Sequence, residues 1–271
     1  MLKVIDLFCG IGGFSDGFIK NGYDVFGVDI WDKCLKSPIH NGNVLQFDIS
    51  KLQKKDLPQN FNKPDIIIGS PPCQTFSTAN QDNRTKDESL INHFRRIVEI
   101  LKPKFWVWEN VVGSTSVQRG QILDAQNFGV AQRRKRNFVS NFDISDTYMY
   151  KYKEQKLSII DVLPKEELLG IGILDGYNSK VYSLYDVSPT IRRIPLKWYD
   201  DRWGTNIPKT KMRFSGFEQL SLEHHLILMG FDRNLQLIGT KTEKMIQIGN
   251  CVSPVVAYAI AERLLSIYDS V

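Results

Sequence analysis

The sequence predicts an α/β fold in which a parallel sheet, covered by helices on both faces, is followed by a smaller and less regular domain. Short apolar runs rich in Val and Ile alternate with amphipathic stretches through the first 110 residues. These runs lack the polar alternation of half-exposed strands, which is typical of strands buried on both faces of a parallel sheet. The sequence pattern changes near residue 141, where polar, aromatic and loop-like segments begin to dominate.

The first half of the chain predicts its elements in a regular order. Residues 3–8 and 24–28 are predicted strands, and a helix over 14–21 starts between them at a glycine-rich turn. Residues 64–69 and 104–109 are two further strands, with a helical pattern at 91–101 between them. Ligands of such a doubly wound sheet bind beyond the carboxyl ends of its strands.

The last residues of the sequence again show a regular pattern, that of a helix. Ser253 and Pro254 form a favourable helix start, a cap residue followed by proline at the first helical position, and an apolar helix face follows them. We therefore expect one domain built from residues 1–140 and 244–271. Residues 141–243 are expected to form the second, smaller domain.

The composition is that of a globular protein and excludes several other classes. Hydrophobic residues make up 42% and charged residues 24% of 271 residues, and no apolar run approaches the ~20 residues of a membrane span. The first residues lack a leader pattern, so we expect a cytoplasmic protein without a membrane partner, associated with the nucleoid in a prokaryote. Four scattered cysteines without a Cys-x-x-Cys pair predict neither a disulfide framework nor a metal site. A net charge of +5 is compatible with a polyanionic partner but is too small to establish one.

A glycine turn and two following strand ends indicate a nucleoside-bearing cofactor. Gly10, Gly12 and Gly13 lie between the first strand and the first helix, where glycine allows the backbone to approach a ligand. Ser15 stands where G-x-G-x-x-G requires its third glycine, which argues against a dinucleotide. After the second strand, Asp29 is placed for a ribose diol and Trp31 for stacking on adenine, and Asp48 is placed for an exocyclic amine. Each is individually as compatible with a structural role.

The most specific local signal is a cysteine framed by prolines. Cys73 follows Pro71 and Pro72 just beyond a predicted strand end. A buried structural cysteine needs no such rigid approach, whereas a nucleophile does. The polar stretch 78–91 that follows reads as a loop.

Two further segments supply an acid and a run of positive charge. Glu109 ends a strongly apolar strand, where partial desolvation raises a carboxyl pKa and suits the group to hydrogen-bonding a substrate nitrogen. Residues 132–136 carry four cations, and the flanking 126–130 and 137–140 favour a strand. Alternation along it predicts Gln132, Arg134 and Arg136 on one face and the other two cations opposite.

Six segments in order resemble those of the cytosine carbon-5 DNA methyltransferases. They are DLFCGIGGF at 6–14, PPCQ at 71–74, ENV at 109–111, QRRKR at 132–136, SPT at 188–190 and GNCVSP at 249–254. The resemblance implies a Rossmann-like S-adenosylmethionine-dependent methyltransferase domain with a small target-recognition domain. It implies S-adenosylmethionine as methyl donor, no metal, and the following cofactor contacts: Phe8, Gly10, Ile11, Gly13, Asp29, Trp31, Asp48, Ile49, Pro72, Asn250 and Val252.

The resemblance also implies a covalent mechanism on a flipped-out cytosine. The Cys73 thiolate would add to carbon 6 while Glu109 hydrogen-bonds or protonates ring nitrogen 3. Arg134 would hold the base and its phosphate and lower the pKa of the Cys73 thiol. Release of the carbon-5 proton and of Cys73 would restore the ring after methylation. The base must leave the stacked duplex first, and the loop after Cys73 is the expected lid.

Double-stranded DNA is the expected partner, and a restriction-modification or orphan-methylase context is the expected setting. A cognate restriction endonuclease would be a functional partner, with no stable protein partner implied. Sequence choice is assigned to 141–243, above all to the basic and aromatic stretch 192–213. The predicted DNA contacts are Arg84, Gln132, Arg136, Arg192 and Arg193. Residues 111–131 are short for the helix and strand that the family carries there, so the sheet is expected to be trimmed on that side.

Three alternatives remain open from the sequence. A transfer-RNA cytosine-5 methyltransferase shares this motif set, and basic charge does not separate the two polymers. A catalytically silent nucleic-acid-binding regulator should lack the nucleophile, so Cys73 and Glu109 argue against it. A nicotinamide dehydrogenase is disfavoured by Ser15 and by the proline-framed cysteine.

Overall fold

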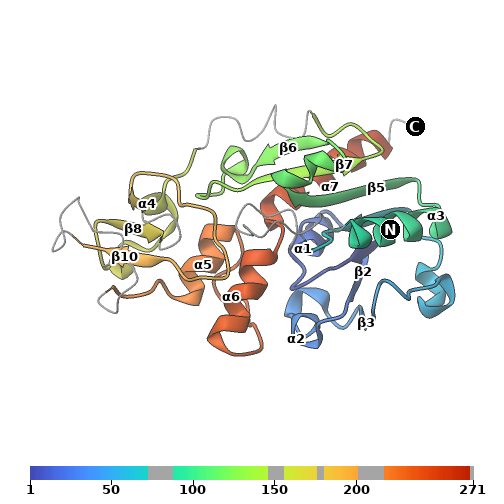
Figure 1. Ribbon diagram of the computed structural model, residues 1–271, viewed down its shortest axis with the longest axis horizontal. Helices are drawn as coiled ribbons and strands as arrows, with labels where there is room; N and C mark the ends of the chain where they lie inside the picture. The colour runs from blue at the N-terminus through green and yellow to red at the C-terminus, as the bar shows by residue number, and fades with distance from the viewer. Residues whose placement is uncertain (73–87, 146–155, 176–179, 201–216, 269–271) are drawn as a thin grey trace.

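The computed structural model describes residues 1–72, 88–145, 156–175, 180–200 and 217–268. Its main feature is a seven-stranded sheet in the order β3-β2-β1-β4-β5-β7-β6 (Figure 1). The strands are β1 (Lys3–Leu7), β2 (Asp24–Asp29), β3 (Val44–Gln46), β4 (Ile66–Gly69), β5 (Phe105–Val111), β6 (Gln121–Asp124) and β7 (Lys135–Ser140). The first five are parallel, which confirms the predicted fold class.

Helices cover both faces of this sheet. Helices α1 (Gly13–Lys20) and α7 (Pro254–Tyr268) share one apolar cluster with β1, β4 and β5, and α3 (Ser89–Leu101) shares another with the opposite face. Gly17 lets α1 and α7 approach closely, because a Cβ there would lie 2.3 Å from the Tyr258 nitrogen. Chain segments more than 230 residues apart therefore build one core beside the first strand, where Tyr23 Oη also donates to the Ala261 carbonyl.

The far edge of the sheet differs from the prediction. Residues 112–120, all of them described, hold a short 3-10 turn (Val112–Ser116) but no α-helix. The sheet nevertheless continues, because β6 and β7 add two antiparallel strands beside β5. The strand expected around 126–140 begins only at Lys135, and Ala125–Phe128 forms a 3-10 turn. Residues 112–120 carry the chain from β5 past the position of β7 to β6, and the antiparallel pair β6–β7 then needs only the connection 125–134.

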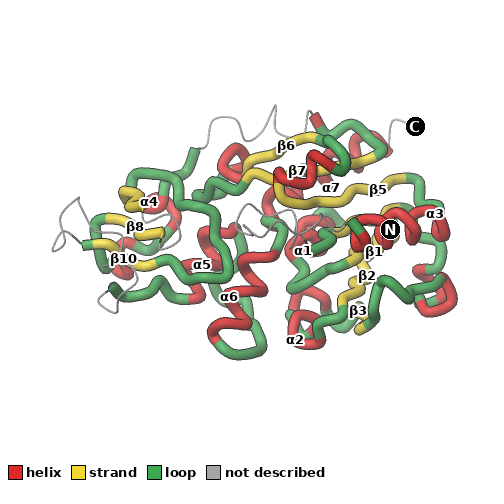
Figure 2. The backbone as a smooth tube through the Cα atoms, in the orientation of Figure 1, coloured by secondary structure: helices red, strands yellow, loops and turns green. Residues whose placement is uncertain are grey.

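A second, three-stranded sheet lies in the later part of the chain. Its order is β10-β8-β9, formed by β8 (Gly172–Asp175), β9 (Lys180–Ser183) and β10 (Lys197–Tyr199). Helices α4 (Ile159–Val162), α5 (Leu222–Met229) and α6 (Lys241–Asn250) accompany it, with α5 and α6 between the two sheets (Figure 2). One apolar cluster joins this region to Ile11 and Cys34 of the first part. The predicted domain boundary after residue 243 falls inside α6, and the division itself remains a prediction.

The chain's last two helices form a nearly continuous stretch, Lys241–Tyr268. It is long and apolar enough to cross a membrane by length and composition alone, but 56% of its most apolar window is buried inside the protein. The stretch breaks at 251–253, where Cys251 has extended backbone and α7 begins at Pro254. Because α7 packs along α1, we assign the stretch to the protein core.

Candidate active site

A cavity of about 330 Å³ lies at the carboxyl ends of β1, β2, β4 and β5, opposite the segment that joins α6 to α7. This is where a doubly wound sheet binds its ligands. The predicted residues that line it are Phe8, Gly10, Asp29, Trp31, Pro72, Glu109, Arg134, Asn250 and Val252, with Arg136 beside them. The structure thus brings most of the predicted cofactor contacts and the predicted acid, Glu109, together in the lining of one cavity.

The glycine turn at the base of the cavity contains residues in the left-handed region of backbone conformation, which glycine adopts more easily than other residues. Gly10 and Gly12 have φ angles of 53° and 90°, and Phe8 shares the left-handed region at 59°. Gly13 is required for another reason, because a Cβ there would lie 2.2 Å from the Val252 carbonyl oxygen. The turn and the C-terminal segment are therefore in direct backbone contact.

Ser15, the departure from the dinucleotide pattern, has a defined partner. Its hydroxyl donates to Asp6 Oδ2 at 2.7 Å, and the Ser15 backbone also bonds this carboxyl. The helix cap position is Gly12, which has no side chain, so Asp6 serves the first turn of α1 from strand β1. Burial raises the pKa of Asp6 to about 7. No spacing in the sequence predicted this pair.

Asp29 organises the turn as well as lining the cavity. Its Oδ2 accepts the Gly10 N–H and its Oδ1 accepts the Trp31 N–H, both at 2.9 Å. Each carboxylate oxygen can accept a further hydrogen bond, so this geometry leaves capacity for a diol.

Four predicted cofactor contacts are not among the residues that line the cavity. Ile11 and Ile49 are buried in apolar clusters, and Gly13 packs against Val252. Asp48 Oδ1 accepts the Ser50 N–H and hydroxyl at 3.0 and 2.7 Å, and these bonds lower the pKa of Asp48. The expected contact of Asp48 with an amine therefore remains a prediction without geometric support in this structure.

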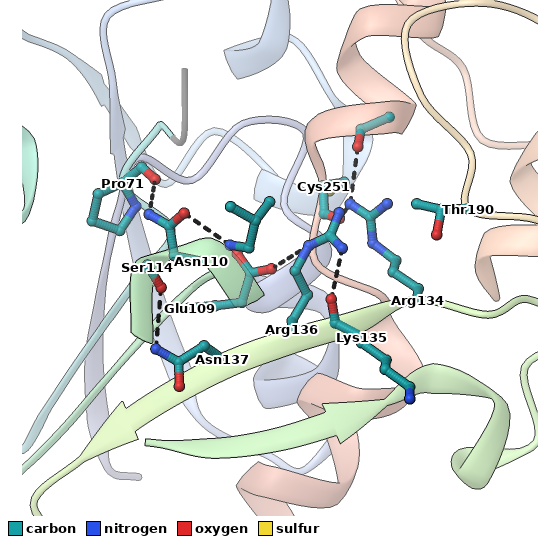
Figure 3. Close-up of polar contacts among 12 residues, drawn as sticks. Pro71, Glu109, Asn110, Ser114, Arg134, Lys135, Arg136, Asn137, Thr190 and Cys251 are labelled. Carbon is teal, nitrogen blue, oxygen red and sulfur yellow. Dashed lines mark hydrogen bonds and ion pairs between the residues drawn. The ribbon is translucent and has the colours of Figure 1, made fainter. Parts of the chain in front are cut away.

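The segment that leads to Cys73 is tethered to two strands. The Ser70 N–H donates to the Leu7 carbonyl at 3.1 Å, which continues the sheet beyond β4. Asn110 Nδ2 donates to the Pro71 carbonyl at 3.0 Å, and its Oδ1 accepts the Val111 N–H (Figure 3). Asn110 thus anchors the proline pair, a role that the sequence did not reveal. Cys73 and Arg84 lie outside the described residues.

The predicted acid is buried and paired. Glu109 is only 5% exposed, and the Nε atom of Arg136 lies 3.0 Å from its Oε1 (Figure 3). Burial raises the pKa of Glu109, while Arg136 and Arg134 oppose the rise. The net direction is upward, as the strand-end position predicted.

Comparisons with known proteins agree with this geometry. The model of the C-5 cytosine-specific DNA methylase family matches residues 2–121. The matched residues include the glycine turn, Pro71–Pro72 and Glu109. Two similar relatives are Type II methyltransferase M.HgiDI of Herpetosiphon aurantiacus, 28% identical over 97% of this chain and 94% of its own, and Type II methyltransferase M1.HphI of Haemophilus parahaemolyticus, 27% identical over 97% and 87%. This chain is a DNA cytosine-5 methyltransferase.

Solved structures share the fold of this methylase. A putative DNA modification methyltransferase encoded within an E. coli prophage superposes with a TM-score of 0.72 at 22% identity, covering 99% of this chain and 100% of the other. Dnmt2 methyltransferase of S. pombe superposes with a TM-score of 0.70 at 18% identity, over 98% and 99% of the two chains.

Arg134 has a position in the fold of this methylase that the sequence did not predict. Its side chain is buried, and its guanidinium donates to the carbonyls of Ile191 and Gly249 at 3.2 and 2.9 Å. It also donates to the Cys251 carbonyl at 2.7 Å (Figure 3). These bonds tie β7 to the C-terminal segment. The expected contact of Arg134 with base and phosphate stays a prediction, and Arg136 is the cation that contacts Glu109.

Gln132 also has a structural position rather than an exposed one. It is fully buried, its Nε2 donates to the Leu228 carbonyl at 3.0 Å, and its Oε1 accepts the Ile191 N–H. This argues against the expected DNA contact. The predicted alternation itself is confirmed, because Arg133 and Lys135 are exposed while Gln132 and Arg134 are buried.

The basic and aromatic stretch is only partly described. Arg193 is exposed, whereas Arg192 is half-buried, with its NH1 3.9 Å from Asp175 Oδ2. Trp198 and Tyr199 are buried in the core of the smaller sheet, so neither presents a surface for bases. Residues 201–216 lie outside the described residues, and the assignment of sequence choice to 192–213 stays a prediction.

Proposed function

We propose that this methylase transfers a methyl group from S-adenosylmethionine to carbon 5 of a flipped-out cytosine in double-stranded DNA, through a covalent adduct with Cys73. One observation carries the proposal. A single cavity has the glycine turn, Asp29 and Trp31 on its wall together with Glu109, Arg136 and Pro72, the residue before Cys73. The methyl donor, which carries a nucleoside, and the target pyrimidine base can thus bind in one cavity.

The cavity suits the donor by size and by chemistry. Its volume of about 330 Å³ lies at the lower end of the range of ligand sites. Trp31 and Phe8 offer aromatic faces, and Asp29 retains acceptor capacity for a ribose diol. When bound, S-adenosylmethionine supplies an electrophilic methyl group on a positively charged sulfur. Asn250 and Val252 line the wall across from the turn.

The three cysteines that line the cavity are poor candidates for the nucleophile. Cys9, Cys34 and Cys251 line it, and burial raises the pKa of each thiol, to about 12 for Cys251. Since the thiolate is the nucleophile, these groups stay unreactive near neutral pH. This leaves Cys73, the one remaining cysteine of the sequence, as the candidate nucleophile.

Glu109 and Arg136 act on the base in this proposal. Burial favours the protonated form of Glu109, which then donates to ring nitrogen 3. This withdraws electrons from the ring as the Cys73 sulfur forms a bond to carbon 6, and carbon 5 becomes nucleophilic. Once carbon 5 is methylated, its proton leaves to a base, the carbon–sulfur bond breaks, and Cys73 departs as thiolate. Arg136, beside Glu109, is placed to contact the base in place of Arg134.

Mechanism-based trapping tests the proposal. Duplex DNA containing 5-fluorocytosine should form a covalent complex with the wild-type protein in the presence of S-adenosylmethionine, because fluorine does not leave as a cation. Cys73→Ala should abolish trapping, whereas Cys34→Ala should not. Trapping that persists in Cys73→Ala would refute the nucleophile, and trapping of transfer RNA in preference to duplex DNA would refute the substrate.

The cellular setting is also a proposal. The relatives named above are Type II methyltransferases, which supports a role in restriction-modification alongside a cognate endonuclease. We propose a cytoplasmic enzyme in which residues 141–243 read the target sequence. Bisulfite sequencing of DNA from cells that express the protein should show 5-methylcytosine in one short sequence, and methylation without sequence preference would contradict this setting.

A further inference from the structure

A short segment behind the glycine turn holds two of its carbonyl groups. Ser37 Oγ donates to the Ile11 carbonyl at 2.8 Å, and His40 Nε2 lies 2.9 Å from the Gly10 carbonyl oxygen. Both side chains are almost fully buried, at 5% and 4% exposure. Neither residue lines the cavity, so they meet the turn from its other side.

The hydrogen bond from His40 has a defined direction. A carbonyl oxygen only accepts, so Nε2 carries the proton. Burial lowers the pKa of His40, which keeps the ring neutral at pH 7 with Nε2–H as its one donor. The Cys9 sulfur, 3.9 Å from the same nitrogen, adds a weak contact.

These bonds matter because packing does not hold Gly10. A Cβ at Gly10 would meet no atom within 4 Å, and the residue has a φ angle of 53°. Its N–H is held by Asp29 and its carbonyl by His40. Beside it, the turn rests on Ile39, whose Cγ2 lies 2.7 Å from the Cβ position of Gly12. The path of the backbone at the cavity wall is therefore set by hydrogen bonds from both sides.

We infer that His40, with Ser37, is a positioning residue for the cofactor site, which fixes the glycine turn without contacting the cofactor. This rests on the proposed function, in which S-adenosylmethionine occupies the cavity. Loss of the Nε2–H would leave a buried carbonyl without a donor and allow Gly10 to shift. The expected effect is on cofactor affinity rather than on the methyl-transfer step, since Glu109 and Arg136 lie on β5 and β7 and not in the glycine turn.

Calorimetric titration with S-adenosylmethionine and S-adenosylhomocysteine tests the inference on four variants. His40→Phe should weaken binding of both by about 10-fold, the scale of one lost buried hydrogen bond. His40→Gln, which can present an amide N–H, should recover most of the loss. Ser37→Ala should weaken binding about 3- to 10-fold. His93→Phe, on α3 and away from the cavity, is the matched control and should bind as the wild type does.

Kinetics and unfolding separate positioning from general destabilisation. The KM for S-adenosylmethionine should rise in His40→Phe by the same factor as the dissociation constant, with kcat within about twofold of wild type. Unchanged affinity in His40→Phe, or a fall in kcat with unchanged KM, would overturn the inference. If His40→Phe does not fold, unchanged affinity in Ser37→Ala overturns it instead. Failure of the wild type to bind either compound would refute the proposed cofactor, and this inference with it.

Discussion

The buried carboxyl of Asp6 makes the stability of this methylase depend on pH in an unusual direction. The residue is 0% exposed, and its Oδ1 has no hydrogen-bond partner among the described residues. Its pKa of about 7 compares with an ordinary value of 3.8, and burial is the largest cause. The native state therefore binds a proton more tightly than the unfolded chain does. The free energy of unfolding should fall as pH rises from about 4 to about 7, and level off above that.

The substitution Asp6→Asn removes the titrating group and keeps its shape. A pKa rise from 3.8 to about 7 corresponds to at most roughly 4 kcal/mol of unfolding free energy. The stability of Asp6→Asn relative to wild type should therefore increase by up to that amount between pH 4 and pH 7. The Asn carbonyl still accepts the Ser15 hydroxyl, while its amide needs a new acceptor, which lowers stability by a similar amount at every pH.

Urea unfolding followed by circular dichroism at pH 5, 6, 7 and 8 measures the effect. Asp24→Asn, at the start of β2, is the control and should keep the wild-type pH dependence. The reasoning is wrong if Asp6→Asn and wild type show parallel pH profiles, or if wild-type stability rises relative to the variant with pH.

Three further predictions concern the cavity. Arg134→Lys should lower the free energy of unfolding by about 2–4 kcal/mol in urea titrations, because one ammonium cannot replace bonds to three carbonyls; a loss below 0.5 kcal/mol would contradict the structural role. Glu109→Gln should lower kcat by about 10²- to 10⁴-fold in a methyl-transfer assay while calorimetry shows unchanged cofactor affinity; loss of both would point to a collapsed site. Asp29→Ala should weaken S-adenosylmethionine binding by about 1.5–3 kcal/mol, measured by calorimetry, and unchanged affinity would limit Asp29 to its bonds with Gly10 and Trp31.

The parallel half of the fold could be predicted because its signals are local. Unbroken apolar runs such as residues 66–68 are buried on both faces, and each lies within a strand at nearly its predicted bounds. The β6–β7 pair could not be predicted in the same way. Alternation indicated a strand near β7 but nothing indicated β6, and the place of the pair is fixed by pairing with β5 rather than by its own sequence.

The sequence predicted those residues of the site that are marked by their own position at the end of a strand. Asp29 and Glu109 are such residues, and both line the cavity. Asn110, His40 and Asp6 act through partners that lie 39, 30 and 9 residues away in the chain. Those partners are known only once the strands are placed side by side, so no spacing in the sequence indicated them.

The cationic run 132–136 shows how pairing assigns different tasks to similar residues. Alternation predicts that Arg134 and Arg136 share a face, but it does not say which one meets the acid. The pairing of β7 with β5 decides this, since Arg136 lies opposite Val111 and therefore diagonal to Glu109. Arg134 precedes the strand and reaches the C-terminal segment instead.

That segment also packs on Gly13 and lines the cavity, so Arg134 links the start of β7, the strand that pairs with β5, to the cavity wall. The two arginines therefore differ in what their replacement should change. Loss of Arg134 removes bonds within the fold, and its effects should appear in unfolding and in cofactor affinity together. Loss of Arg136 leaves a buried carboxyl without its cation, which should raise the pKa of Glu109 further. A shift in the pH dependence of methyl transfer in Arg136→Met, at unchanged cofactor affinity, would separate the two roles in one experiment.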